Sequence, residues 1–432
     1  MRNRHKSHSF SPTGRSPRRL KHSFNLPPIY KEKKLRFLHT IANTKDTTVL
    51  LSKGFEVEMY TGTPAGEVVG FSDKIVAAIE GFVREPDARN VEYTTAPFCR
   101  YEHLLCELLK PRVRLRQYLK SLGDYTIIPG STLPLGGAQE FHRSDPQNPY
   151  HTYIENTYGT DVVTASIHIN VGISDLEELI RACRLIRLEA PLYLALTASS
   201  PFFDGSITGF HSTRWHLFPQ TPKHVPLFES HLHHIRWVEE QLEAGSMQSV
   251  RHLWSSVRPN GDRRPYNLNR LELRICDLVS DPLHLLAVTA LLEARLHQML
   301  QTPALDPLES SQLPANTRRE DLLAIALENE KAVAKNSLEA QLRHWETGKI
   351  ITAKAWIEQL YHDVQPFAKQ SGIGCFLNPI KQILREGNQA QRWLRQAEID
   401  SPTEVIQGAI AQMKEQETLL AQDICQPTPA YV

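Results

Sequence analysis

Three segments of the chain alternate apolar and polar side chains with the two-residue period that is typical of a β-strand with one buried face. They are residues 49–60 (in the second half), 162–172 and 270–277. Side chains at positions i and i+2 of a strand project to the same side, so each segment has one apolar and one polar face. The polar faces carry Glu56 and Glu58, then Ser166, His168 and Asn170, then Glu272 and Arg274, and a shorter alternating segment at 90–95 carries Glu92.

Apolar residues also recur at helical spacing between and after these strands. Helices are expected from Ser72, over 99–122 with a break or kink at Pro111, from Ser174, and from Asp281 to about Gln301. Beyond 301–318, a polar and proline-bearing connector, the chain is expected to be almost wholly helical, with a first helix from 319 to about 347. Long helices mixed with strands, without regular βαβ alternation, favour an α+β fold.

Charge divides the chain unequally. The 432 residues include 49 Lys and Arg against 48 Asp and Glu, yet residues 1–34 hold ten basic residues and one acid. The remaining body has 39 basic and 47 acidic residues, a net charge of −8, which argues against a nucleic-acid-binding surface. No apolar run approaches the ~18 residues of a membrane helix, so no membrane span is expected.

The basic segment at 1–34 is poor in apolar residues and is expected to be disordered and outside the fold. Three interpretations remain open: a solvated extension, an arm that binds nucleic acid or a membrane surface, or upstream sequence included in the reading frame. The first and third are favoured. The segment also weakly resembles an organelle transit peptide. The body then divides into a sheet-containing catalytic part at 35–300, the connector at 301–318 and a helical region at 319–432 packed on the same domain.

The six cysteines are scattered without CxxC spacing, which argues against a disulfide scaffold or a structural zinc site and favours a reducing, cytoplasmic location. Cys276 is expected to be a buried, inert thiol. The cluster of His231, His233 and His234 has no carboxylate at ligand spacing, so a solvated helix face is expected there. The sequence contains no P-loop, no G-x-G-x-x-G and no G-x-S-x-G motif.

Carboxylates two residues apart on a strand are hard oxygen ligands of the kind that Mg²⁺ takes. Together with His168 and Glu92 they form a set that would repel itself unless divalent cations lay among it. Arg274, beside Glu272, offers planar donors for a carboxylate or phosphate. Each feature also has an ordinary explanation: E-x-E is common on the solvated face of an antiparallel sheet, a single histidine is usually structural, and loop arginines such as Arg214 and Arg258 are usually surface charges.

Five motifs occur together in one order: GFEVEMY, NVEYTTAPF, ASIHINVG, SSPFFDGSITGFHSTRW and LELRICD, beginning at residues 54, 90, 165, 199 and 271. In this order the chain resembles the glutamate–cysteine ligases, in the branch that includes bacterial carboxylate–amine ligases, and most closely the cyanobacterial type. The resemblance covers roughly residues 50–300, with a looser likeness through the C-terminal helices. It implies a glutamine synthetase-like cup of largely antiparallel strands backed by helices.

The resemblance further implies an enzyme that uses ATP and Mg²⁺ to convert the γ-carboxylate of glutamate into γ-glutamyl phosphate, which the amine of cysteine then attacks. This reaction is the first step of glutathione biosynthesis. The implied metal ligands are Glu56, Glu58, Glu92, His168 and Glu272. Arg274 and Arg214 take the catalytic positions, and Arg258, Asn170 and Ser166 the substrate- or ATP-binding ones. Two alternatives remain open: a ligase with another amine or carboxylate, and a non-catalytic binding or regulatory protein of the same fold.

Overall fold

The computed structural model describes residues 49–424, so the predicted basic tail at 1–34 lies outside the described residues. Its centre is a seven-stranded antiparallel sheet in the order β2-β3-β1-β5-β9-β8, with β4 also paired to β1. The strands are β1 Lys53–Gly62, β2 Phe82–Arg84, β3 Asn90–Thr94, β4 Thr126–Ile128, β5 Ile167–Gly172, β8 Val257–Asn260 and β9 Arg270–Leu273. The long β1 connects the two halves of the sheet, because one of its edges pairs with β3 and the other with β5 and β4.

One face of the sheet is apolar and fully buried. Phe55 and Val57 of β1, Ile169 of β5, and Leu271 and Leu273 of β9 are at most 1% exposed. Helix α3 (Tyr101–Leu122) packs on β1, and α5 (Leu176–Thr197) packs on β8, β9 and α8 (Pro282–Gln301). Burying each side chain of this size contributes roughly 1.5–3 kcal/mol, so the alternation in sequence fixes which face receives the helices. The polar face lies on the opposite side.

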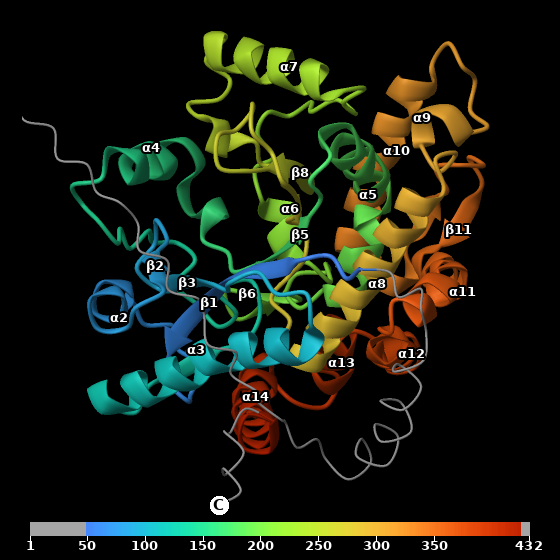
Figure 1. Ribbon diagram of the computed structural model, residues 1–432. Helices are drawn as coiled ribbons and strands as arrows, with labels where there is room; N and C mark the ends of the chain where they lie inside the picture. Colours follow the sequence, from blue (N-terminus) through green and yellow to red (C-terminus); the bar gives the residue numbers. More distant parts are fainter. Residues whose placement is uncertain (1–48, 425–432) are drawn as a thin grey trace, which may run out of the picture.

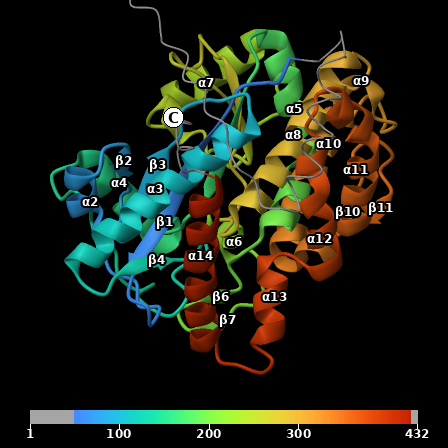
Figure 2. The ribbon, with the colours of Figure 1, turned by 60° about the horizontal axis from the view of Figure 1, so that its bottom comes forward.

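The C-terminal helices continue the same core. Helix α10 (Arg318–Asn336) packs on α5, and both α11 (Ala353–Gln370) and α12 (Asn378–Glu386) pack on α8 (Figure 1). The last helix, α14 (Pro402–Ile424), crosses α3 (Figure 2). There the carboxylate of Glu417, 1% exposed, binds the guanidinium groups of Arg112 and Arg116. The α+β fold with a helical C-terminal region is therefore confirmed.

Two local predictions are wrong. The helix expected over 319–347 ends at Asn336, and a hairpin of β10 (Gln341–Arg343) and β11 (Ile350–Thr352) follows. The side chain of Asn329 donates to the Arg343 carbonyl and accepts from its N–H, which holds this hairpin on α10. The second concerns Pro111, where a break or kink is expected: α3 continues through the proline without a break, since buried leucines on both sides anchor the helix.

The expected helix caps are only partly correct. Asp281 caps α8, with Pro282 as its first residue, whereas α5 is capped by Asp175, one residue after the expected Ser174. The remaining elements are α2 Ser72–Ala78, α4 Pro149–Tyr158, β6 Phe202–Phe203, β7 Ser206–Ile207, α6 Thr213–Leu217, α7 His231–Glu243, α9 Pro307–Ser310, α13 Gln389–Gln396 and the 3₁₀ turns η1 Gly159–Val162, η2 Val250–His252, η3 Ser337–Glu339 and η4 Gly374–Leu377. None of the helices between residues 49 and 424 combines the length and the apolarity needed to cross a membrane.

Candidate active site on the polar face of the sheet

The strand register brings the polar side chains into one row. Glu58 pairs with Glu92 across β1 and β3, and Glu56 pairs with His168 across β1 and β5. Farther along, Glu272 of β9 lies opposite Asn170 of β5 and opposite Arg258 of β8. Directly opposed residues have their Cβ atoms about 4.5–5.5 Å apart, so side chains from five strands meet on one surface.

At one end of this row three carboxylates gather. Ligand oxygens of Glu58, Glu85 and Glu92 lie within 4.8 Å of one another. Burial, followed by the nearby charge of Glu58, raises the pKa of Glu85 to about 8. Burial together with Glu85, Glu56 and Glu58 raises the pKa of Glu92 well above its usual range. Glu85, which directly follows β2, was not among the predicted site residues. We call these three residues the acidic end.

The centre of the row is a hydrogen-bonded chain. The Ser166 hydroxyl donates to Glu58 Oε2 (2.8 Å) and lies 3.1 Å from His168 Nε2. His168 Nδ1 lies 2.8 Å from Glu56 Oε2, and the Asn170 amide donates to Glu56 Oε1 (3.2 Å). Ser166 and Asn170 thus contact the carboxylates next to them and orient those groups.

At the other end Glu272 is fully enclosed, with no exposed surface. Arg258 donates to both of its oxygens (2.7 and 3.1 Å), Asn260 donates to Oε2 (2.6 Å), and Arg274 donates to Oε1. Burial alone would raise the pKa of Glu272, but Arg258 and Arg274 hold it well below its usual range. His168 Nδ1 lies 3.5 Å from Glu272 Oε1, so the two ends of the row are connected.

The remaining donor of Arg258, Nη1, is directed to the backbone carbonyls of Arg251 and Leu253. The expected role of Arg258 in binding substrate or ATP therefore does not match its contacts. All three nitrogens of its guanidinium donate to groups of the protein, and two of them, Nε and Nη2, position Glu272.

Arg214 is likewise enclosed, at 2% exposure. Its Nη1 and Nη2 donate to the carbonyls of Ile275 and Arg274 (both 2.9 Å), just after β9. Asp277, 3.7 Å from Arg214 Nη1, accepts the hydroxyls of Ser200 and Ser212. In place of the expected catalytic contact, Arg214 holds the backbone from which the side chain of Arg274 projects.

Two other predictions lie away from the row. Cys276 is buried, and burial raises the pKa of its thiol to about 12, as expected of an inert cysteine. The histidine cluster lies on α7, but the expected solvated face is only partly correct: His234 is 2% exposed and packs edge-on against Phe228. Burial lowers the pKa of His234 to about 3.

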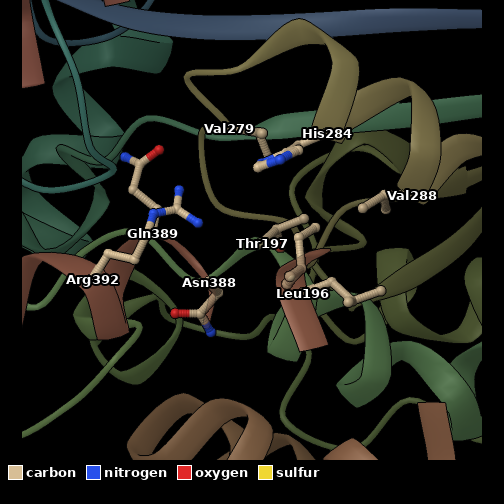
Figure 3. Close-up of a pocket in the computed structure, with 9 residues that line it drawn as sticks. Leu196, Thr197, Val279, His284, Val288, Asn388, Gln389 and Arg392 are labelled. Carbon is tan, nitrogen blue, oxygen red and sulfur yellow. The ribbon is translucent and has the colours of Figure 1, made fainter. Parts of the chain in front are cut away.

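A separate cavity lies between α5, α8, α12 and α13 (Figure 3). Thr197, His284, Asn388 and Arg392 are among the residues that line it, and its volume is about 10 Å³. That volume suits one water molecule, so this cavity is too small for a substrate.

The donor set of the acidic end fits a divalent cation. Its three carboxylates are hard oxygen ligands, and a cation among them would offset the repulsion that, together with burial, raises the pKa of Glu85 and Glu92. A second possible ligand group, Glu56, His168 and Glu272, also has ligand atoms within 4.8 Å of one another. In that group Arg258 and Arg274 already compensate Glu272.

A family model for glutamate–cysteine ligase family 2 matches residues 52–416. The chain belongs to this family. A protein of Rubrobacter xylanophilus that is provisionally named glutamate–cysteine ligase 2-3 is 25% identical over 335 residues, 74% of this chain and 85% of that protein. A Gloeobacter violaceus protein provisionally named glutamate–cysteine ligase 2 is 30% identical over 233 residues, 53% of this chain and 58% of its own.

Two solved structures share the fold at low identity. Glutamate–cysteine ligase from Francisella tularensis, crystallised in complex with AMP, superposes with a TM-score of 0.69 at 13% identity, over 86% of this chain and 89% of that one. A bifunctional glutathione synthetase from Pasteurella multocida gives 0.67 at 14% identity, over 90% of this chain and 54% of that one. The family assignment confirms the resemblance seen in the five motifs.

Proposed function

We propose that this family member is an ATP- and Mg²⁺-dependent ligase that joins the γ-carboxylate of glutamate to the amine of cysteine through γ-glutamyl phosphate, the first step of glutathione biosynthesis. The observation that carries the proposal is the row itself, in which a carboxylate cluster at one end is joined to buried arginines at the other. Phosphoryl transfer to a carboxylate needs such a combination, since both its reactants are anionic. The AMP in the Francisella enzyme supports an adenine nucleotide as the phosphoryl donor.

In this proposal Glu58, Glu85 and Glu92 hold one Mg²⁺, and Glu56, His168 and Glu272 contribute to a second position. Bound there, Mg²⁺ supplies charge neutralisation for the phosphate oxygens and orients them. The Ser166 hydroxyl contacts both Glu58 and His168, and the Asn170 amide donates to Glu56, so each of them holds a carboxylate of the row in place. These contacts keep the carboxylates preorganised, which limits the reorganisation needed when substrate binds.

Arg274 is the residue we assign to the transferring phosphate. One of its terminal nitrogens binds Glu272, while its Nε is buried without a hydrogen-bond partner among the described residues. Glu272 fixes the plane of the guanidinium, and Arg214 fixes the backbone that carries it. A planar donor held in this way can stabilise charge that develops on a phosphoryl oxygen.

One assay tests the proposal: release of inorganic phosphate from ATP with Mg²⁺ and glutamate, across a panel of amino-acid acceptors. We expect turnover that depends on cysteine and a product that contains a γ-glutamyl amide. Turnover only with a different acceptor would mean that the acceptor is not cysteine, while the proposed phosphoryl transfer to the carboxylate would stand. Absence of turnover with every acceptor would contradict the enzymatic function.

A further inference from the structure

The end of the row near Glu272 carries more positive charge than its acids balance. Besides Arg258 and Arg274, the half-buried Arg264 lies in the loop that joins β8 to β9. Its Nη1 is buried and has no hydrogen-bond partner among residues 49–424, and the same holds for Nε of Arg274, a residue 8% exposed. A buried cationic donor without a partner is unfavourable, so two of them near the same end of the row need an explanation.

Arg264 lies close enough to the Glu272 end to interact with the charges there. Burial lowers the pKa of Arg264, Glu272 opposes this, and the positive charges of Arg251, Arg270 and Arg274 lower it further. The carboxylate of Glu272 is already shared between Arg258 and Arg274. Arg264 therefore lies near several other cations, and the buried acid among them, Glu272, already binds Arg258 and Arg274.

The loop that carries Arg264 is held firmly. The N–H groups of Tyr266 and Asn267 both donate to the Arg263 carbonyl, and the Asn269 N–H donates to the Asn260 carbonyl. Glycine is required at 261, because a Cβ there would lie 2.1 Å from the Asn267 carbonyl oxygen. From α7, His231 Nε2 lies 2.9 Å from the Pro265 carbonyl oxygen. Arg264 is thus presented by a fixed loop.

We propose that Arg264, together with Arg274, binds an oxyanion of a substrate, either a phosphate of the nucleotide or a carboxylate of the amino acid, at the Glu272 end of the row. The identity of these ligands rests on the proposed function. Guanidinium forks bind phosphate and carboxylate oxygens alike, and such a ligand would give partners to both unpaired donors and neutralise the local excess of charge. Water alone would give partners to the donors but leave that excess in place.

The test compares two neighbouring arginines of the same loop. Arg264→Gln removes the proposed contact, and Arg263→Gln is the matched control, because Arg263 is exposed. Losing one charged hydrogen-bond donor is expected to weaken the affected ligand about 10- to 100-fold. A nucleotide phosphate predicts a raised KM for ATP, and an amino-acid carboxylate predicts a raised KM for glutamate. Arg264→Lys should recover part of the loss, while the Tm of all three variants stays near that of the unchanged protein.

Binding of MgATP and of glutamate by calorimetry gives a readout that does not depend on turnover. If the unchanged protein binds either ligand and Arg264→Gln weakens that binding, the inference holds even when no acceptor supports turnover and the proposed function fails. If Arg264→Gln matches Arg263→Gln in binding and in both KM values, the inference is wrong and the proposed function stands. If the unchanged protein binds neither ligand, both are wrong.

Discussion

The two ends of the polar row use the same residue type in opposite ways. At the acidic end, burial and then the neighbouring carboxylates raise the pKa of Glu85 and Glu92. At the other end Glu272 is more deeply buried, yet its pKa is lowered, because Arg258 and Arg274 donate to it. Burial raises the pKa at both ends of the row, and the neighbours on adjacent strands decide whether that rise is reinforced, as at Glu85 and Glu92, or overcome, as at Glu272.

This difference separates the five predicted metal ligands into two groups. Glu58 and Glu92, joined by Glu85, form a cluster that an external cation would stabilise, whereas Glu272 carries its compensation within the chain. The acidic end is then the part of the site made for a ligand of positive charge. The Glu272 end, which contributes to the second proposed metal position, also carries the arginines that suit a ligand of negative charge.

The largest effect is expected from Glu85→Gln. Removing one charge from the acidic end should lower kcat/KM by about 1,000-fold, because electrostatic stabilisation of phosphoryl transfer by a bound cation contributes several kcal/mol. Glu67→Gln is the control, since Glu67 is exposed and lies outside the row. The measurement is phosphate release at saturating Mg²⁺. If the Glu85→Gln variant keeps more than a tenth of the activity, Glu85 is not a metal ligand.

Stability should show the opposite order. Glu272→Gln leaves Arg258 and Arg274 buried without a carboxylate and should lower the free energy of unfolding by about 3 kcal/mol. Without Mg²⁺, Glu85 is mostly protonated at pH 7, because its pKa is raised to about 8, and it then resembles Gln. Glu85→Gln should therefore leave the free energy of unfolding unchanged at pH 7 and raise it above about pH 8, where the charged Glu85 would be repelled by its neighbours. Urea unfolding of both variants in the presence of a chelator measures the contrast. Equal losses in the two variants would mean that the two ends are not electrostatically different.

A smaller effect is expected when Mg²⁺ binds the unchanged protein. At ten times its Kd, the ion should add about 1.4 kcal/mol to the free energy of unfolding, which raises Tm by a few degrees. Glu67→Gln should show the same rise, and Glu85→Gln should lose it. Sodium chloride at equal ionic strength controls for screening. A rise that persists in Glu85→Gln would place the ion elsewhere.

The sequence predicts the polar face well because alternation is a local property: Glu56, His168 and Glu272 each lie on a strand whose apolar face can be recognised without its neighbours. Glu85 was missed for the same reason. It follows the three-residue strand β2, and it reaches Glu92 only because β2 and β3 form a hairpin in which Val83 pairs with Glu92. A pair of acids seven residues apart around the turn residues Pro86 and Asp87 was the available signal.

The roles of the arginines depend on pairings that no local pattern contains. Arg258 meets Glu272 through the register of β8 and β9, and Arg214 reaches the carbonyl of Arg274 across 60 residues of sequence. The hairpin after α10 was missed similarly, because the side chain of Asn329 that holds it looks like any polar position of a helix. Contacts between distant segments, rather than composition, decide which cation is available to a substrate.

The smallest effect is expected from deleting residues 1–34, which carry ten Lys and Arg and one acid. If the acidic end is balanced by Mg²⁺ and not by these cations, the deletion should leave Tm within about a degree and the Mg²⁺ requirement within about two-fold. The physical reasons are the low apolar content of the segment and the Debye length of about 8 Å at physiological ionic strength, which limits the reach of exposed charges. Tm and phosphate release as a function of Mg²⁺, at low and at physiological salt, measure both quantities. A lower Mg²⁺ requirement after deletion, with the largest change at low salt, would mean that cations of the basic segment compete with Mg²⁺ at the acidic end. The folded part and its ligands would then not balance the row alone.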